Sequence, residues 1–168
     1  DPTLRYNATS GNFYRFVSTA SNYATAQANA SSLTLFGQAG YVASSTSASE
    51  NSLLQSMAGG AVIWLGGSDS TVEGQWLWNG GAEAGDMFWL GTSGGSAQNG
   101  YYSNWAGGEP NDSGGNEDGM QMRTDGRWND ISAGNSFAYI VEWDGAAVIA
   151  AIQNGPYSLG EHTAVGAS

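Results

Sequence analysis

The spacing of hydrophobic residues predicts that the chain opens with a strand followed by a helix. Residues 12–17 alternate between two faces, which is typical of a strand. Beyond them, Ser21 is placed to cap a helix that we expect over Ser21–Leu35. The apolar positions of this helix recur at helical spacing and are Tyr23, Ala26, Ala30 and Leu33. The first third of the chain is therefore organised by a strand–helix unit.

A second helix is predicted by the sequence Ser-Ala-Ser-Glu at residues 47–50. This is the pattern of a capping box, in which the serine and the glutamate satisfy backbone N–H groups at the helix start. We expect the helix over Ser47–Met57, with Leu53, Leu54 and Met57 on its buried side. Gly59 and Gly60 end it, because glycine readily takes the left-handed conformation that follows many helices.

The remaining hydrophobic pattern predicts short strands around a core rich in tryptophan. Strands are expected at residues 61–65, 73–78, 120–123, 127–129 and 138–143. Asp125-Gly126 is a turn signal between two of them. Alternation favours the core over ligand stacking for four tryptophans: Trp64, Trp76, Trp78 and Trp143. The apolar segment Met87–Leu90 is interpreted as a flap on this core, and a wall beside a ligand is the alternative.

Composition excludes several classes of partner. The 168-residue chain has a formal net charge of −11 and no lysine, so it cannot neutralise the phosphates of nucleic acid or an anionic membrane surface. No apolar run approaches the ~20 residues that a membrane span needs. The absence of cysteine excludes disulfides and thiol chemistry. One domain with a sizeable core is expected at this length.

Carboxylates are concentrated between Asn104 and Asp130. Six of the fifteen acidic residues lie between Glu109 and Asp130, and glycines and a proline break any regular pattern over residues 106–119. Such a loop repels itself unless a cation lies within it, and carboxylate and amide oxygens are the ligands of Ca²⁺. Zinc requires histidine or cysteine, and the one histidine is the distant His162. Composition alone leaves a calcium-organised loop and a solvated acidic loop both open.

Three motifs in this segment resemble the sugar-binding loop of C-type lectin domains of the mannose-binding type. They are Glu109-Pro110-Asn111, Glu117 and Trp128-Asn129-Asp130. In that family these motifs surround a principal calcium ion, and adjacent sugar hydroxyls complete its shell. The resemblance implies that calcium and sugar share five residues: Glu109, Asn111, Glu117, Asn129 and Asp130. It also implies a cis bond at Glu109–Pro110, since only bonds before proline reach cis at small cost.

A second group of carboxylates matches an auxiliary calcium site of the same family. The resemblance implies that its ligands are Asp69, Glu73, Asp112, Glu117 and Asp118. Two or more calcium ions are therefore expected as cofactors.

The resemblance covers residues 12–144 and implies an α+β, C-type lectin-like fold. Two helices would flank antiparallel sheets, and a long loop would bind calcium. Residues 1–11 are interpreted as a lead-in, and residues 145–168 as one extra strand at residues 146–152 followed by a linker. Members of the family in animals carry disulfides, so the cysteine-free sequence indicates a bacterial version.

The resemblance implies calcium-dependent binding of carbohydrates and no enzymatic activity. The expected partners are cell-surface or extracellular glycans with mannose-, fucose-, glucose- or N-acetylglucosamine-type sugars, without nucleic acid or membrane insertion. We expect an adhesive role outside the cell, on a secreted or surface-anchored protein. An ice- or protein-binding module on the same fold is the main alternative. A glycosidase acid–base pair at Glu83 and Asp86 is a third interpretation.

Overall fold

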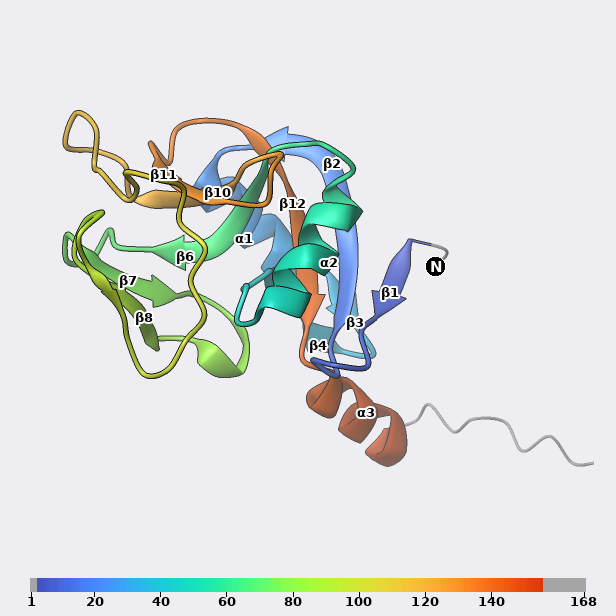
Figure 1. The fold of residues 1–168 in the computed structure, drawn as a ribbon. Coiled ribbons are helices and arrows are strands. Elements are labelled where there is room, and N and C mark those ends of the chain that lie inside the picture. Colours follow the sequence, from blue (N-terminus) through green and yellow to red (C-terminus); the bar gives the residue numbers. More distant parts are fainter. Residues whose placement is uncertain (1–2, 156–168) are drawn as a thin grey trace, which may run out of the picture.

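The structure is a computed structural model that describes residues 3–155 (Figure 1). Its helices are α1 (Tyr23–Ser32), α2 (Ala48–Ala58) and α3 (Gly145–Asn154), with a short 3₁₀ turn at Gly81–Glu83. The strands of the first half are β1 (Leu4–Tyr6), β2 (Phe13–Ser21), β3 (Thr34–Leu35), β4 (Gln38–Ala39), β5 (Tyr41–Val42) and β6 (Ile63–Ser68). Those of the second half are β7 (Gln75–Trp78), β8 (Met87–Leu90), β9 (Ser96–Ala97), β10 (Gly119–Met122), β11 (Trp128–Ile131) and β12 (Phe137–Trp143).

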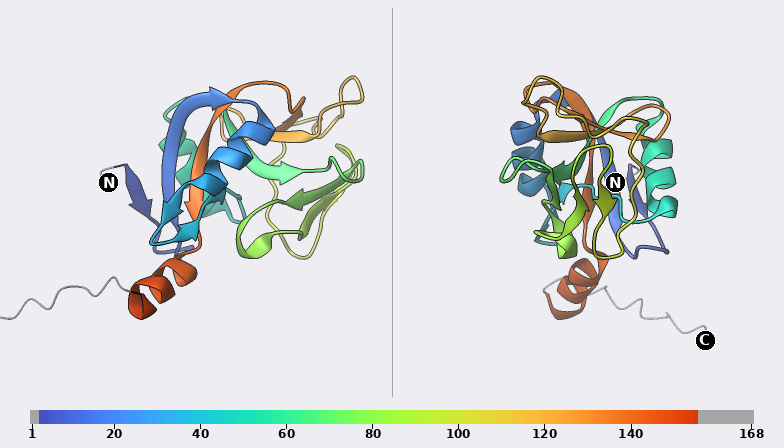
Figure 2. Two further views of the ribbon diagram at one scale, coloured as in Figure 1. Left: turned by 180° about the vertical axis from the view of Figure 1, so that it is seen from behind. Right: turned by 60° about the vertical axis from the view of Figure 1, so that its left-hand side comes forward.

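One large sheet connects most of these strands. Its main path has the order β1-β2-β12-β6-β7-β8-β9, and β10 pairs with both β6 and β11. All of its pairs are antiparallel except β12 with β6. The helices α1 and α2 flank the sheet on opposite sides, as Figure 2 shows. This arrangement confirms the predicted α+β, C-type lectin-like fold, with a third helix and one parallel pair added.

The first helix begins at Tyr23, two residues later than expected, and its cap moves by one residue. Its N-cap is Asn22, whose Oδ1 accepts a hydrogen bond from the Thr25 backbone N–H at 2.9 Å, whereas Ser21 is the last residue of β2. Asparagine caps helices as well as serine does, so the local sequence did not decide between them. The helix also ends before Leu35, because Leu33 is already extended and Leu35 pairs in β3.

The second helix has the predicted cap but a different buried face. Ser47 accepts from the Glu50 backbone N–H at 3.2 Å, and Gly59 ends the helix at φ 60°. Leu54 is buried as expected, whereas Leu53 and Met57 are only partly buried. The buried face is completed by polar residues, because Glu50 and Asn51 make hydrogen bonds inside the protein.

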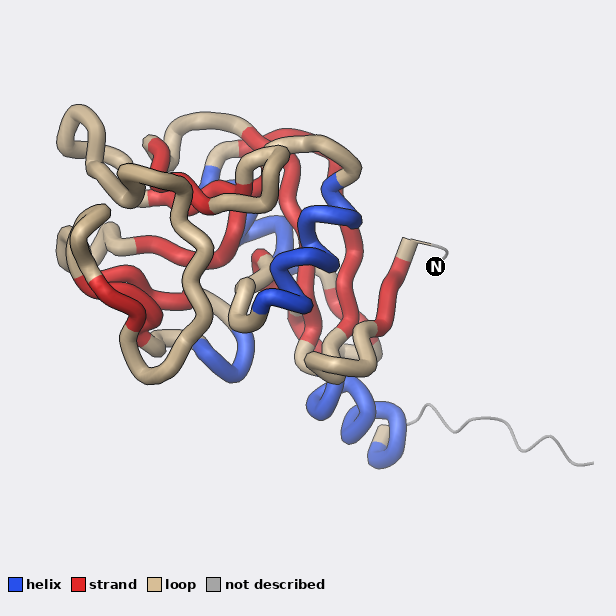
Figure 3. Tube along the Cα trace, in the orientation of Figure 1, coloured by secondary structure: helices blue, strands red, loops and turns tan. Residues whose placement is uncertain are grey.

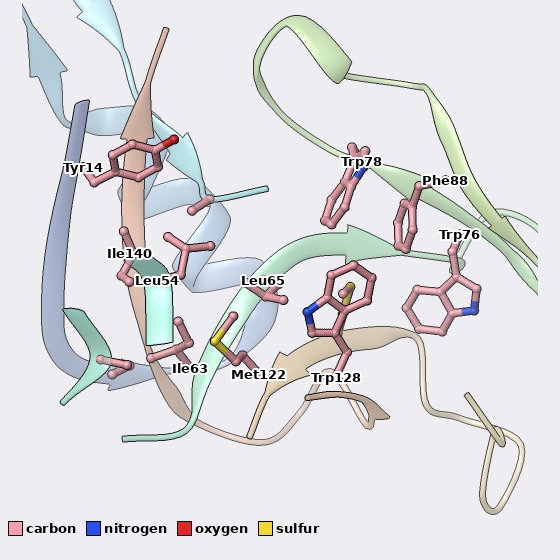
Figure 4. Close-up of a cluster of buried hydrophobic side chains, with 14 residues drawn as sticks. Tyr14, Leu54, Ile63, Leu65, Trp76, Trp78, Phe88, Met122, Trp128 and Ile140 are labelled. Carbon is pink, nitrogen blue, oxygen red and sulfur yellow. The ribbon is translucent and has the colours of Figure 1, made fainter. Parts of the chain in front are cut away.

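The core holds the four predicted tryptophans. Trp64, Trp76, Trp78 and Trp143 are all buried, and so is Trp128. Phe88 of β8 stacks on Trp78 with 4.0 Å between ring centroids, and both lie near Trp128 in Figure 4. The segment Met87–Leu90 is therefore an integral strand that contributes a ring to the core. Each buried ring of this size contributes roughly 1.5–3 kcal/mol of hydrophobic stabilisation.

The extra strand predicted at residues 146–152 is wrong, because this segment forms α3. The Oδ1 of Asp144 caps the helix by accepting from the Ala147 N–H at 3.0 Å, and alanine favours helix strongly. The lead-in contains β1, which pairs with β2. The predicted linker after residue 155, with His162, lies outside the described residues.

The long loops gather at one end of the fold. In both views of Figure 2, the loop over residues 106–118 lies at the end of the molecule opposite to α3. Figure 3 shows that loops make up most of this end, and that strands make up the rest. The predicted calcium loop therefore lies among the loops at the end of the fold opposite to α3.

Candidate functional site

The acidic loop is tied to β11 by backbone hydrogen bonds on both sides of Trp105. The Trp128 N–H donates to the Asn104 carbonyl at 2.9 Å, and the Ala106 N–H donates to the Trp128 carbonyl at 2.8 Å. Because β11 continues from Trp128 through Asn129 to Asp130, this anchor places the loop over the Trp-Asn-Asp motif.

Asp130 is the centre of this arrangement. Its side chain is 1% exposed, and its Oδ2 accepts hydrogen bonds from the backbone N–H groups of Asn111 at 2.8 Å and Asp112 at 2.6 Å. Its Oδ1 is buried and has no hydrogen-bond partner among the described residues. Leaving a carboxylate oxygen buried without a partner costs stability, so this atom fits a cation as its missing partner.

Glu109 and Asn111 lie beside Asp130. The Asn111 Nδ2 donates to the Glu109 Oε2, and the Glu109–Pro110 bond is cis, as the resemblance implied. Burial raises the pKa of the Glu109 carboxyl, and the charge of Asp130 raises it further. The two carboxylates therefore repel each other in the absence of a cation.

Glu117 approaches the same group from the far end of the loop. Its Oε2 accepts from the Ser113 N–H at 2.8 Å, and the Asp112 Oδ1 accepts from the Glu117 N–H at 3.1 Å. Burial raises the pKa of the Glu117 carboxyl, followed by the charges of Asp130 and Asp112. The backbone of Asp112 has a left-handed φ of 46°. The hydrogen bond that its side chain accepts from the Glu117 N–H closes this turn of the loop.

Asn129, the remaining residue predicted for the principal set, lies on β11 and contacts the backbone of its neighbour Asp130. Its Nδ2 donates to the carbonyl oxygen of Asp130 at 2.5 Å. The structure thus links Glu109, Asn111 and Asp130 directly, and brings the Glu117 charge close to Asp130.

A second acidic group joins the β6–β7 loop to the end of the acidic loop. Asp69, Glu73 and Asp118 each offer one oxygen, and these atoms lie within 4.8 Å of one another. Asp69 is 3% exposed; its Oδ2 accepts from the Gly74 N–H at 2.9 Å, and its Oδ1 is buried without a partner among residues 3–155. Three of the five predicted auxiliary residues therefore converge, whereas Asp112 and Glu117 are outside this group of atoms.

The charges of this second group are poorly compensated. Burial raises the pKa of Asp69 to about 7, and the carboxylates of Glu73 and Asp118 add to the shift. The donor set consists only of oxygens, which suits a hard cation such as Ca²⁺. Like Asp130, Asp69 thus offers a buried oxygen that a bound cation would satisfy.

Sequence reasoning missed the support behind β11. The Trp128 Nε1 donates to the Asn51 Oδ1 at 2.8 Å, and the Asn51 Nδ2 donates to the Gly126 carbonyl at 3.0 Å. Asn51 thereby fixes the hairpin that carries the Trp-Asn-Asp motif to α2. An asparagine next to the capping glutamate was the only sequence signal for this contact.

The candidate catalytic residues Glu83 and Asp86 take part in hydrogen bonds within the protein. The Asp86 N–H donates to the Glu83 carbonyl at 2.8 Å, and the Asp86 Oδ2 accepts from the Tyr101 Oη at 2.6 Å.

Across residues 3–155, no helix is both long enough and apolar enough to span a bilayer.

Two solved structures share the fold over most of this chain. The carbohydrate-recognition domain of cow CD23, solved in the presence of a GlcNAc2Man3 oligosaccharide, has a TM-score of 0.64 and 25% identity, covering 84% of this chain and 93% of that one. A calcium-independent type II antifreeze protein has a TM-score of 0.63 and 24% identity, covering 84% and 92%. The second likeness concerns the fold alone.

Relatives in sequence cover the same region. Halomucin of Haloquadratum walsbyi is 36% identical over 140 residues, which are 83% of this chain and 2% of halomucin. The α-N-acetylgalactosamine-specific lectin of Patiria pectinifera is 36% identical over an alignment of 142 residues that covers 77% of this chain and 73% of that lectin. The family model of the lectin C-type domain matches residues 27–142. The chain therefore belongs to the C-type lectin domain family.

Proposed function

We propose that this domain binds carbohydrates in a calcium-dependent manner. The observation that carries the proposal is the Oδ1 of Asp130, which is buried without a partner among the described residues while the other oxygen of the same carboxylate holds the loop. A buried charge of this kind is retained where a cation compensates it. Its neighbours in the loop are carboxylates and an amide, the donors that calcium takes.

Two sets of residues would hold calcium. The principal set is Glu109, Asn111, Glu117, Asn129 and Asp130, and the auxiliary set is Asp69, Glu73, Asp112, Glu117 and Asp118. Calcium bound in the principal set supplies coordination positions for two adjacent sugar hydroxyls. The chain's own part is to orient the hydroxyls, because carboxylates accept hydrogen bonds from them and amides donate to them.

Sugar choice would follow from the side on which acceptor and donor lie. Glu109 is an acceptor and Asn111 can donate, and the two side chains are adjacent in the structure. We propose that this arrangement of acceptor and donor selects sugars with equatorial 3- and 4-hydroxyls, such as mannose, glucose and N-acetylglucosamine, or the matching pair of hydroxyls in fucose. The related Patiria pectinifera lectin is named for N-acetylgalactosamine, so this choice needs a direct test.

Adhesion outside the cell is the role that suits such a site. A single sugar contributes few contacts, so one site is expected to bind with a dissociation constant on the order of 0.1–1 mM, about −4 to −5.5 kcal/mol. Useful attachment then needs several copies, whose combined affinity exceeds that of each site. The chain spans 2% of halomucin, so the role of a longer protein containing this domain, secreted or surface-anchored and bacterial, belongs to this proposal.

An ice- or protein-binding function is the alternative on this fold, which an antifreeze protein shares. A glycan array probed in calcium and in chelator separates the two. Calcium-dependent binding of mannose- or fucose-type glycans supports the proposal. Equal binding in both buffers, or no binding to any glycan, refutes it.

A further inference from the structure

A second pair of buried carboxylates lies outside the calcium-loop residues. Glu50 of α2 and Glu142 of β12 are each 2% exposed. The Tyr14 hydroxyl of β2 lies between them, 2.5 Å from the Glu50 Oε1 and 3.1 Å from the Glu142 Oε1. Three elements that are distant in sequence therefore meet at one phenol oxygen.

The other hydrogen bonds of the pair come from neutral groups. The Glu50 Oε2 accepts from the Thr46 N–H and Oγ1, both at 2.8 Å. The Glu142 Oε1 accepts from the Asn12 Nδ2 at 2.7 Å, and its Oε2 from the Ser44 N–H at 3.1 Å. These contacts organise the carboxylates without cancelling two negative charges.

The Tyr14 hydroxyl has more partners than hydrogens. It carries one hydrogen and lies within hydrogen-bond distance of the Glu50 Oε1, the Glu142 Oε1 and, at 2.9 Å, the Ser10 Oγ. When that hydrogen serves the short contact to Glu50, the contact to the Glu142 Oε1 needs another one, which the Ser10 contact does not place between these two oxygens. A proton on Glu142 would complete a chain of hydrogen bonds from Glu142 through Tyr14 to Glu50.

We infer that Glu50, Tyr14 and Glu142 share one extra proton at neutral pH and form a pH-sensitive latch between α2 and the β2–β12 strands. Burial, followed by the charge of Glu50, raises the pKa of Glu142 to about 8, with Glu83 adding to the shift. Burial also raises the pKa of Tyr14, and the charges of both glutamates raise it further, so Tyr14 remains a donor.

The other titratable groups on neighbouring elements are Tyr41, Glu83 and Arg15. Tyr41 of β5 has a pKa raised by burial and by Glu142, so its phenol stays neutral. Burial raises the pKa of Glu83, followed by the charges of Glu50 and Asp144. The Arg15 guanidinium of β2 lies 5.9 Å from the centre of the Trp143 ring.

The latch lies next to the support of the ligand site. Asn51 follows Glu50 on α2 and bonds to the Trp128 Nε1 and the Gly126 carbonyl of the β10–β11 hairpin. Loosening the start of α2 therefore loosens the contact that fixes the strand carrying Asn129 and Asp130.

The sign of the pH effect follows from the two protonation states. The folded domain holds the proton up to about pH 8, whereas an ordinary glutamate releases it near 4.5. The stabilisation is complete below the lower value and is lost as pH rises through the upper one. The equilibrium constant for unfolding should rise by up to about tenfold per pH unit on this account.

The test compares denaturant unfolding at pH 5, 6.5 and 8.5, in chelator, for the native chain and two variants. Glu142→Gln carries a fixed neutral group in place of the carboxyl. The dependence of its unfolding free energy on pH should therefore be smaller than that of the native chain by the contribution of one proton. Asp125→Asn, in an exposed turn, should keep the native slope. An unchanged slope in Glu142→Gln overturns the inference.

NMR titration of the native protein keeps the inference testable if Glu142→Gln does not fold. Residue-specific carboxyl carbon shifts should show one proton retained on the Glu50–Glu142 pair at pH 6.5 and released near pH 8. Both carboxyls ionised at pH 6.5, with or without calcium, would show that no shared proton exists and would overturn the inference.

Discussion

Replacing Asp130 by asparagine separates the two proposed roles of this side chain, which are to accept hydrogen bonds from the loop and to bind calcium. The new amide keeps one acceptor oxygen for the N–H groups of Asn111 and Asp112, which donate to the native Oδ2 at 2.8 and 2.6 Å. It puts an N–H₂ group where the unpartnered Oδ1 lies. The loop should therefore stay folded in chelator, and the variant should lose less stability there than Asp130→Ala, because the removal of a buried uncompensated charge offsets the weaker hydrogen bonds of a neutral acceptor.

The calcium response of Asp130→Asn should be smaller. A cation that binds only the folded state stabilises it by about 2.7–4.1 kcal/mol at 100 to 1,000 times its dissociation constant. For a domain of this size, each kcal/mol raises the melting temperature by roughly 2–4 °C. Loss of the principal ion should thus remove roughly 5–15 °C of the calcium-induced rise, together with sugar binding.

Asp130→Ala is the matched comparison, because it also removes the acceptor for two loop N–H groups. Hydrogen bonds to a charged group contribute about 1.5–3 kcal/mol each, so this variant should lose stability in chelator as well as in calcium. Melting curves in both buffers and calorimetric sugar titration measure these effects. If Asp130→Asn still binds sugar in calcium with native affinity, Asp130 is not a ligand.

Three further predictions concern the site and its support. The double change Glu109→Gln with Asn111→Asp should keep calcium binding but lose or reverse the preference for mannose over galactose, measured by calorimetry; stronger galactose binding by the native domain contradicts the assignment. Calcium affinity should fall by roughly tenfold per pH unit below 7, because protons compete at Asp69, whose metal-free pKa is about 7. The same shift makes the metal-free domain lose stability as pH rises from about 4 to 7, and a calcium affinity that is flat between pH 5.5 and 7.5 would rule this out. Asn51→Ala should destabilise the domain by about 2–4 kcal/mol, because it removes the acceptor of the buried Trp128 Nε1 and of the Ser45 hydroxyl and leaves the Gly126 carbonyl with Asn104 as its side-chain donor; denaturant unfolding measures it, and a loss below 1 kcal/mol would show that the contact is dispensable.

The sequence by itself determined the features that depend on short-range chemistry. Ser47 and Gly59 bound α2 because capping is a local property of backbone groups. The alternation around Trp76 and Trp78 placed both rings in the core, since strand geometry fixes which side chains share a face. The Glu-Pro-Asn and Trp-Asn-Asp motifs identified the residues that the fold then brings together.

Tertiary structure decided what depends on contacts between distant segments. The apolar pattern of residues 146–152 predicted a strand, but Val148 packs into the core against distant segments and thereby supports the helix that the local cap from Asp144 begins. Glu50 appeared in the sequence as half of a capping box, yet its side chain bonds Thr46 and Tyr14, because β2 supplies a hydroxyl beside it. Which oxygens of Asp69 and Asp130 remain without a partner among the described residues is likewise invisible in sequence, because it depends on backbone N–H groups that only the folded loops present.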